Sequence, residues 1–399
     1  MAEAETLSRY IARTTIELPS LAALEKAPDA LAPLADMVGD ARVVALGESF
    51  HHTHEQLSLR ALLVRYLVQQ CEFNAILLEA VTPGPNPIAA FVRGGAGDAE
   101  SALIAAGARM WRNQATAALM QWVRAHNEAT KNAPVSVHGL DVMATGPLMR
   151  AVIAHASATD TQRITAWSYG FDGDGRSDQA SYNRLNADER AALHKAFDEA
   201  RPALPEGDTM HEAARVVADA LDMLRAGARG WIEGFALRDR AMARAAIRFI
   251  ERAGDKVIIL SHNTHIAKLA PSTAPTHPPM GAFLSERYGD NYFALGAAFG
   301  RATFDPPIYG VADFAGESHT ADRSIAARGY RAAFVDLRRA SKAQPLRLAG
   351  VGVGPLPYTE YPALSAFDAL AYVDVLTNAR QLIDTELSLD AKAVDATRR

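Results

Sequence analysis

Acidic and basic side chains follow directly after three short apolar runs of the sequence. The runs RVVAL, AILL and KVIIL are followed by Glu48 and His51, by Glu79, and by His262 and His265, respectively. Histidine and carboxylate groups can exchange protons near neutral pH when their surroundings tune them. The residue types therefore predict a site for acid–base chemistry, provided that the fold brings the three segments together.

The apolar runs have the length and composition of buried strands. They cover residues 42–46, 75–78, 135–138, 256–260, 292–295, 333–337 and 369–375. Helical patterns separate most of them, for example over residues 55–70 and 115–128. This alternation predicts an α/β fold with a mainly parallel central sheet and flanking helices. In such sheets the ligand site lies beyond the carboxyl ends of the strands, so we expect the acidic and basic groups to face one another there.

The middle of the chain has a different pattern. Helical periodicity dominates between residues 148 and 253, most clearly over 210–226 and 235–252, and the polar stretch 171–183 predicts a loop. We therefore expect a catalytic domain in two parts, residues 1–147 and 254–399. A mostly helical insertion over residues 148–253 is expected to form one wall of a substrate cleft.

The composition argues against several classes of protein. The 399 residues carry 41 Lys and Arg against 46 Asp and Glu, a formal charge of −5 without a basic stripe, so neither nucleic acid nor an anionic membrane is an expected partner. Cys71 is the single cysteine, which excludes an intrachain disulfide. The N-terminal stretch lacks the apolar core of a signal peptide, and no apolar run reaches the roughly 18 residues of a membrane helix. We expect a cytoplasmic protein.

Together and in this order, the motifs resemble the erythromycin esterase family. GESFH matches the G-E-x-x-H motif of that family, Glu79 in LLEA its second glutamate, and SHNTHIAK its H-N-x-H-I segment. Arg60 stands where the family carries an arginine on the following helix, and LRDRAMA at 237–243 is a weaker similarity. The sequence departs from the family at His52, where a glycine is usual. The resemblance implies that Arg60 fixes a carboxylate or adds a positive field.

The resemblance implies hydrolysis of a carboxylic ester or lactone, with a macrolide-type macrocycle as the leading substrate class. His51 would take a proton from the water that attacks the ester carbonyl, and Glu48 or Glu79 would orient His51. His262 and His265 would position the water or donate to the developing oxyanion. Neither a covalent intermediate, an organic cofactor nor a metal ion is expected, and the partner is a small-molecule ester or lactone.

Other mechanisms fit parts of the pattern. Ser49 in GESFH begins like the G-x-S-x-G elbow of serine hydrolases, but the bulky His51 stands where that elbow requires a small residue. The same histidines and glutamates could hold zinc or manganese; HTHEQLS and HEAAR fail the H-E-x-x-H pattern, but a different metal site stays open. An intramolecular acyl transfer, in which a hydroxyl replaces water, is also open. A non-enzymatic ligand-binding protein, for haem for example, fits the paired carboxylates less well.

Two residues outside the main set carry expectations of their own. Asp141 follows the run VSVH and is either part of the site or an acceptor for loop amides. His277 lies in a loop-like context, which predicts a surface position.

Overall fold

The computed structural model describes residues 6–81, 86–106, 109–130, 134–156, 161–173, 175–205, 209–254, 256–308, 311–315, 320–340, 344–350 and 358–382. The strands are β1 (Thr15–Leu18), β2 (Val43–Leu46), β3 (Ala75–Leu78), β4 (Ser136–Gly139), β5 (Val257–Leu260), β6 (Tyr292–Ile308), β7 (Val311–Ala315), β8 (Ala332–Asp336), β9 (Leu346–Ala349), β10 (Tyr358–Tyr361) and β11 (Ala369–Leu376). The α-helices are α1 (Leu7–Thr14), α2 (Leu21–Leu24), α3 (Ala32–Val38), α4 (His54–Cys71), α5 (Pro87–Val92), α6 (Ala99–Ala105), α7 (Gln114–Ala129), α8 (Gly146–Ala156), α9 (Thr161–Ser168), α10 (Gly175–Arg184), α11 (Ala187–Ala200), α12 (Thr209–Gly227), α13 (Trp231–Ala253), α14 (Asn263–Ile266), α15 (Met280–Tyr288) and α16 (Ala321–Ala326). Short 3-10 helices are η1 (Pro28–Leu31), η2 (Arg109–Trp111), η3 (Tyr169–Phe171), η4 (Arg201–Ala203), η5 (Gly289–Asn291) and η6 (Leu364–Ala366).

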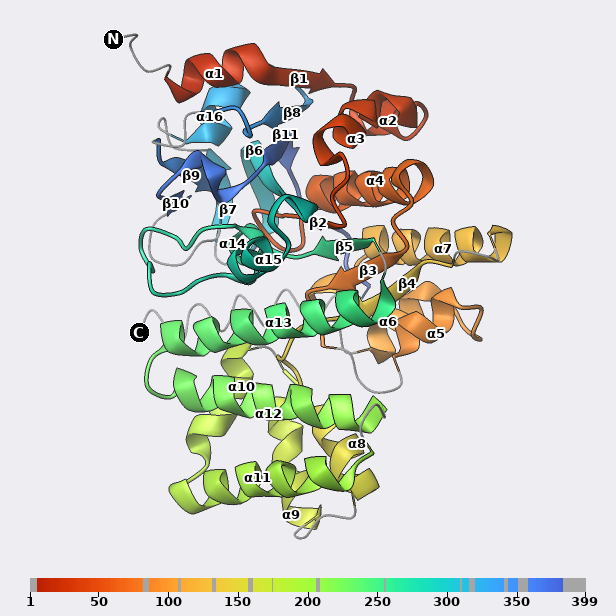
Figure 1. Ribbon diagram of the computed structural model, residues 1–399, viewed down its shortest axis with the longest axis vertical. Coiled ribbons are helices and arrows are strands. Elements are labelled where there is room, and N and C mark those ends of the chain that lie inside the picture. Colours follow the sequence, from red (N-terminus) through yellow and green to blue (C-terminus); the bar gives the residue numbers. More distant parts are fainter. Residues whose placement is uncertain are drawn as a thin grey trace.

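A mixed sheet forms the centre of the fold (Figure 1). Its strand order is β1-β8-β11-β6-β2-β5-β3-β4, with β7 paired to β6. The strands from β11 through β4 in this order are parallel, whereas β8 is antiparallel to β11 and β1, and β7 is antiparallel to β6. The predicted α/β fold with a mainly parallel sheet is confirmed, and each of the seven predicted strands is present.

Helices cover both faces of the sheet, which is why its central strands are apolar on both sides. On one face the side chains of Val44 and Leu46 pack in a core with residues of α3, α4 and α7. On the other face Val43 and Ala45 pack in a second core with residues of α1, α13 and α15. All four residues of β2 are buried. The strand is thereby held rigidly, and so is the start of the segment that follows it.

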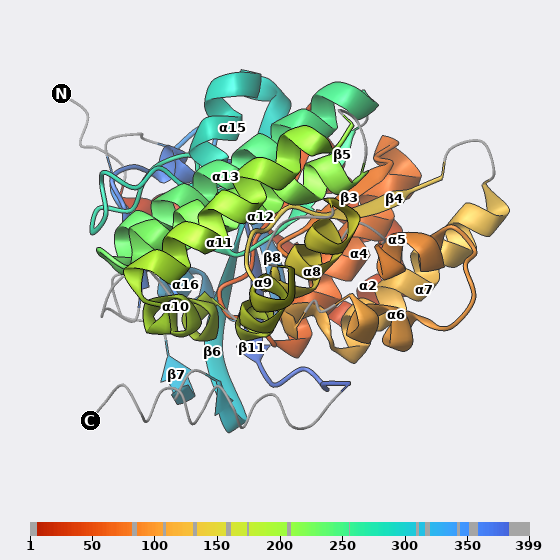
Figure 2. The ribbon, with the colours of Figure 1, turned by 90° about the horizontal axis from the view of Figure 1, so that it is seen from below.

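The helices between β4 and β5 form a layer of their own. Side chains from α8, α11 and α12 share a third apolar core, separate from the two cores of the sheet. In Figure 1 these helices lie below α13, on the side away from the sheet, and Figure 2 shows α11, α12 and α13 side by side. Helix α13 therefore lies between the helical layer and the sheet. Its residues can contact both.

The prediction of a loop over residues 171–183 is wrong from Gly175 onward, where α10 begins. The buried carboxylate of Asp178 accepts the backbone N–H of Gly173 at 3.3 Å and of Ala144 at 2.8 Å. These bonds stabilise a helix start in a stretch whose glycines and polar residues favour a turn. The strands β1, β7, β9 and β10 were not predicted, because they are short or lie at the margins of the sheets and lack a continuous apolar run.

Along the described part of the chain, no helix combines the length and apolar character that crossing a membrane requires.

Candidate active site

The carboxyl ends of β2, β5 and β3 lie next to one another in the sheet. Leu260 at the end of β5 is in register with Leu46 of β2 on one side and with Leu78 of β3 on the other. The segments after the strands are joined by backbone bonds, from Asn263 N to Glu48 O at 2.9 Å and from Glu79 N to Leu260 O at 3.0 Å. The topology thus brings all three predicted segments to one place.

Glycine at the start of the GESFH segment allows a close approach between two of these segments. A Cβ atom on Gly47 would lie 2.1 Å from Oδ1 of Asn263. That amide bridges to the neighbouring strand β6, because Oδ1 accepts from Ala297 N and Nδ2 donates to Ala297 O, both at 2.8 Å. Residue 47 must therefore be glycine if the loop after β5 is to lie against the end of β2.

Glu48 connects His51 and Arg60. Its Oε1 lies 2.7 Å from Nδ1 of His51, and its Oε2 accepts a bond from Nη2 of Arg60 at 2.6 Å. Arg60 reaches the carboxylate from α4, with its guanidinium also over the ring of Trp111 at 5.1 Å. The side chains of Glu48 and Arg60 are 4% and 5% exposed, whereas that of His51 is 15% exposed. His51 is the member of the trio that solvent can reach.

Charge pairing outweighs burial for two members of this trio, Glu48 and His51. Burial alone would raise the pKa of Glu48, but Arg60 and His51 hold it below its usual value. Burial would lower the pKa of His51, but the Glu48 carboxylate and its hydrogen bond raise it above 6.5. Glu48 is therefore ionised at neutral pH, and its carboxylate accepts the hydrogen bond from Nδ1 of His51. In that tautomer Nε2 of the neutral ring carries the lone pair.

Glu79 lies at the centre of a second group of buried charges. Its Oε1 accepts from Nη2 of Arg238 at 2.7 Å, and its Oε2 accepts from the hydroxyl of Ser261 and the backbone N–H of His262, at 2.7 and 2.8 Å. Burial raises the pKa of Glu79, but His265 and Arg238 outweigh it and hold the pKa well below its usual value. With both oxygens bonded, Glu79 fixes the loop after β5.

Arg238 comes from α13 and joins that helix to the sheet edge. Its Nε and Nη2 bind the two carboxylate oxygens of Asp141 at 2.9 and 2.7 Å, in addition to the bond to Glu79. Asp141 also accepts the N–H of Val142 at 2.7 Å. Asp141 thus accepts a loop amide, as one of its two expected roles requires, and it also pairs with Arg238. Helix α13 thus contributes Arg238 to the charged cluster.

His265 uses both ring nitrogens inside this cluster. Nδ1 lies 2.7 Å from Asp239 Oδ1, and Nε2 lies 2.7 Å from Nη1 of Arg238. The carboxylates of Asp239 and Glu79 push the pKa of His265 upward against burial. Both ring nitrogens of His265 are thus occupied by protein groups, and neither is left for a substrate.

His262 is also held by both nitrogens. Nε2 lies 3.1 Å from the carbonyl oxygen of Ser49, and Nδ1 accepts the backbone N–H of Thr264 as the N-cap of α14. Burial, reinforced by the nearby charge of His51, lowers the pKa of His262 to about 4, so the ring is neutral at pH 7. Its centroid lies 5.2 Å from that of His51. His262 packs beside His51 and holds the backbone before it.

Ser49 has the surroundings of a structural hydroxyl. Its side chain donates to Ala297 O at 2.9 Å and accepts from Nε2 of Gln56 at 3.2 Å, and the residue is 1% exposed. A serine nucleophile needs an adjacent base and access to substrate. The geometry therefore agrees with the sequence argument against a serine hydrolase.

The six predicted site residues lie in one cluster, but three of its members were missed. Arg238 and Asp239 lie on α13, and His277 lies in the segment before α15. The prediction that His277 is at the surface is wrong, because the residue is 4% exposed and its Nε2 is 2.9 Å from Oδ2 of Asp239. Asp239 also accepts the N–H of Met280 at 2.9 Å. Asp239 thereby joins His265 to the start of α15.

One sequence signal could have identified Asp239. Positions 239, 243, 246 and 250 have the spacing of one helix face, and the last three are buried apolar residues of the sheet core. An aspartate on such a stripe must be paired, because burial of an unpaired charge is costly. His277 stands between a threonine and two prolines, and that context carries no comparable signal.

Among the described residues, no group of three or more His, Cys, Asp or Glu side chains is arranged to hold a metal ion. The potential ligands point at other protein groups instead: His265 bonds Asp239 and Arg238, and both oxygens of Glu79 are occupied.

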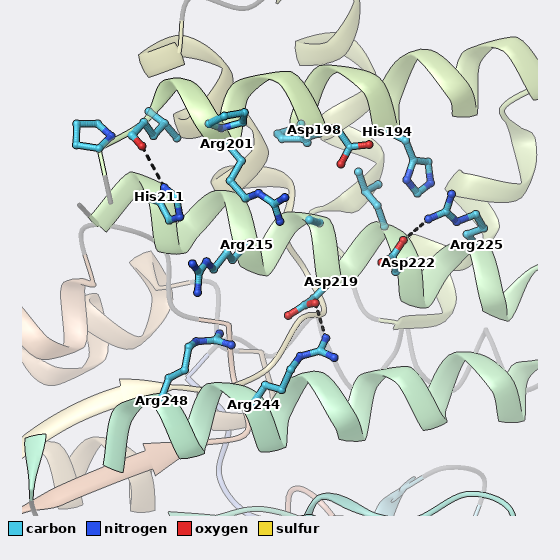
Figure 3. Close-up of a pocket in the computed structure, with 16 residues that line it drawn as sticks. His194, Asp198, Arg201, His211, Arg215, Asp219, Asp222, Arg225, Arg244 and Arg248 are labelled. Carbon is cyan, nitrogen blue, oxygen red and sulfur yellow. Dashed lines mark hydrogen bonds and ion pairs between the residues drawn. The ribbon is translucent and has the colours of Figure 1, made fainter. Parts of the chain in front are cut away.

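A hollow of about 900 Å³ lies elsewhere, along α11, α12 and α13 (Figure 3). Arg244 and Arg248 of α13 line it, on the helix face opposite Arg238 and Asp239 by helical periodicity. Arg244 pairs with Asp219 of α12 there, as Figure 3 shows. The hollow is therefore a feature of the helical layer and is separate from the cluster at the strand ends.

Comparison with known proteins places the chain in a family. The model of the erythromycin esterase family matches residues 68–376. The chain belongs to the erythromycin esterase family. An erythromycin esterase type II from Escherichia coli is 24% identical over 301 residues, which cover 67% of this chain and 71% of that protein. Membership supports an ester hydrolase activity. The matched region includes Glu79, His262 and His265 and begins after Glu48, His51 and Arg60.

Solved structures share the fold over nearly the whole chain. A Bacillus cereus protein superposes with a TM-score of 0.77 at 19% identity, over 94% of this chain and 98% of that one. A succinoglycan biosynthesis protein gives 0.76 at 18% identity, over 94% and 97%. A histidine-to-asparagine mutant of the erythromycin esterase EreC, in an open conformation, gives 0.71 at 19% identity, over 93% and 100%. The erythromycin esterase fold therefore extends beyond the region that the family model matches.

Proposed function

We propose that this protein hydrolyses a carboxylic ester or lactone, with His51 as the general base. The contact that carries the proposal is the 2.7 Å bond between His51 Nδ1 and Glu48 Oε1. It holds the ring in the tautomer whose Nε2 can accept a proton from water. The activated water then adds to the ester carbonyl, and the proton on His51 is returned to the leaving alcohol. General-base catalysis of this kind contributes about two to four powers of ten to a rate.

Arg60 supplies positive charge next to the base. Its Nη2 is bonded to Glu48, while Nε and Nη1 are buried and have no hydrogen-bond partner among the described residues. Addition of hydroxide to the carbonyl creates an oxyanion, and a fixed cation in a buried site stabilises such a charge more strongly than water does. Within the trio of Glu48, His51 and Arg60, Arg60 is thus the residue best suited to stabilise the negative charge of the oxyanion.

His262 and His265 have a positioning role in this mechanism, because they orient a loop and do not contact the substrate. Both nitrogens of each ring are bonded within the protein, so we assign to them the orientation of the loop after β5 rather than donation to the oxyanion. Glu79 and Arg238 fix the same loop by the bonds described above. This assignment narrows the role that the sequence alone predicted for the two histidines.

A macrolide-type lactone is the proposed substrate class. This proposal is supported by the family of the chain and by two similar proteins. They are the Escherichia coli erythromycin esterase type II, at 24% identity, and the erythromycin esterase EreC, at 19% identity. Hydrolysis of a lactone and of an open-chain ester requires the same water activation, so the residues of the trio do not distinguish the two.

The test is a screen of macrolide lactones and simple esters, read by mass spectrometry. Hydrolysis of a lactone adds the mass of one water, and hydrolysis of an open-chain ester splits it into acid and alcohol. A lactone product of unchanged mass would instead indicate an intramolecular acyl transfer, in which a substrate hydroxyl replaces water. His51→Asn should reduce the rate at least about a hundredfold while the far-UV circular dichroism spectrum is retained. A variant within a few-fold of the wild type would contradict the assignment of His51.

A further inference from the structure

A large aromatic side chain is exposed at the start of α13. Trp231, the first residue of that helix, is 51% exposed, whereas the other three tryptophans of the chain are buried or partly buried. Tryptophan has an extensive apolar surface, and a half-exposed tryptophan side chain often marks a binding surface. The core does not account for Trp231, because the residue is in none of the three apolar clusters.

Phe235 connects Trp231 to the buried cluster at the strand ends. It lies one turn further along α13, and its ring meets that of Trp231 edge-on with centroids 5.4 Å apart. The Phe235 ring is also nearly parallel to that of His265, with centroids 6.4 Å apart, and the guanidinium of Arg238 lies 5.6 Å from the Phe235 centroid. Phe235 itself is only partly buried. The two rings form a continuous aromatic surface from solvent to the charged cluster.

We propose that Trp231 and Phe235 bind a flat, apolar part of the ester substrate. The inference rests on the proposed esterase function and specifies the substrate: an ester whose acyl or alcohol group has a broad apolar face, rather than a short-chain ester. Aromatic side chains that meet such a face contribute about 0.5–1.5 kcal/mol per contact beyond the burial of area. The reacting carbonyl would lie deeper, towards His51, and the apolar group would cover the ring of Trp231.

The position of the two rings favours substrate over a partner protein. Phe235 lies beside His265 and Arg238, which belong to the same cluster as Glu79. A partner that covered the rings would also cover this side of the cluster. Another strongly exposed aromatic residue, Tyr169 in η3, has a different environment, because the guanidinium of Arg150 lies 4.3 Å from its ring centroid. Tyr169 therefore offers a matched control.

The experiment compares two esters with the same acyl group, methyl butyrate and 2-naphthyl butyrate. Trp231→Ala should raise KM for the naphthyl ester about two- to twelvefold, the range that corresponds to the stacking energy, with a clearly smaller effect for the methyl ester. Trp231→Phe should restore most of the difference, because it keeps an aromatic face. Tyr169→Ala should change neither KM. An equal change for both esters in Trp231→Ala would overturn the inference.

Binding of a non-hydrolysable analogue separates this inference from the esterase assignment. N-(2-naphthyl)butyramide should bind the wild-type protein, with a dissociation constant that rises about two- to twelvefold in Trp231→Ala, measured by titration calorimetry. If the wild type hydrolyses no ester but this difference in binding is present, the proposed function fails and the aromatic surface stands. If esters are hydrolysed and Trp231→Ala binds the amide as tightly as the wild type does, the aromatic surface fails and the esterase stands.

Discussion

Replacing Glu48 by glutamine should abolish the base function of His51 while keeping the shape of the side chain. Glu48 accepts two donors, Nδ1 of His51 on Oε1 and Nη2 of Arg60 on Oε2. Glutamine offers one oxygen, and the guanidinium of Arg60 can only donate, so the oxygen turns to Arg60 and the amide NH₂ turns to His51. Nδ1 must then accept a bond, and the ring proton moves to Nε2. The base nitrogen loses its lone pair.

The expected loss in kcat/KM is about a hundred- to ten-thousandfold, the range for removal of a general base. It corresponds to about 3–5 kcal/mol of barrier. The pH dependence should change as well. Glu48 raises the pKa of His51 above 6.5 against burial, and the base is active only when neutral, so wild-type activity falls as the pH drops through this raised value. Without the carboxylate, burial and Arg60 both lower the pKa, and the acid limb moves to lower pH.

The assay is the pH profile of kcat/KM for an ester found in the substrate screen, measured for the wild type and Glu48→Gln. Glu25→Gln is the control, because Glu25 is 67% exposed and its contact with Arg65 is 4.0 Å long. This variant should match the wild type in rate and profile. Thermal unfolding of Glu48→Gln identifies any loss of fold. A folded Glu48→Gln protein with kcat/KM within about threefold of the wild type and an unshifted acid limb would refute the reasoning.

Three further predictions concern the same cluster. Ser49→Ala should stay within about tenfold of wild-type activity and the wild type should resist fluorophosphonate labelling; a labelled Ser49 with a dead alanine variant would show a serine hydrolase. Asp239→Asn should lower the free energy of unfolding at pH 6 by about 2 kcal/mol, because the partners of Asp239 hold its pKa at about 2 rather than 3.8, and urea titrations should find this difference fading as the pH falls through that interval. Activity should survive dialysis against a chelator; loss that zinc or manganese reverses would establish a metallohydrolase.

Local sequence predicted seven of the described strands and placed Glu48 and His51 together, whereas Arg60 was named through the family resemblance. The run RVVAL is apolar at every position, and each side chain of β2 is buried between two helical layers. GESFH then places Glu48 and His51 three positions apart, close enough to bond directly. Arg60 belongs to the helix that follows at once. These three residues lie within one strand–loop–helix unit, so their contacts depend little on the rest of the fold.

The second half of the site depends on packing between distant segments. Arg238 bonds Glu79 and Asp141, which precede it by 159 and 97 positions. No pattern near Arg238 reveals those partners, because they meet only when α13 lies across the carboxyl ends of β3 and β4. The buried helix face that includes Asp239 indicates that this carboxylate needs a hydrogen-bonding or charged partner. It does not indicate which residue that partner is. Helical periodicity over residues 235–252 predicted this helix, and the weak LRDRAMA similarity gave no role to either residue.

His52 has a strained backbone conformation directly after the proposed base. Its φ of 65° lies in the left-handed region, which favours glycine. Histidine there costs on the order of 1 kcal/mol, as strained backbones at functional sites do. Two contacts hold the turn in this conformation. His51, the preceding residue, is bonded to Glu48, and the carbonyl oxygen of His52 accepts a hydrogen bond from the backbone N–H of Ala379 at 2.7 Å. The contacts that orient the base therefore also maintain the strain at the next residue, and the loop depends on the surrounding fold for its shape.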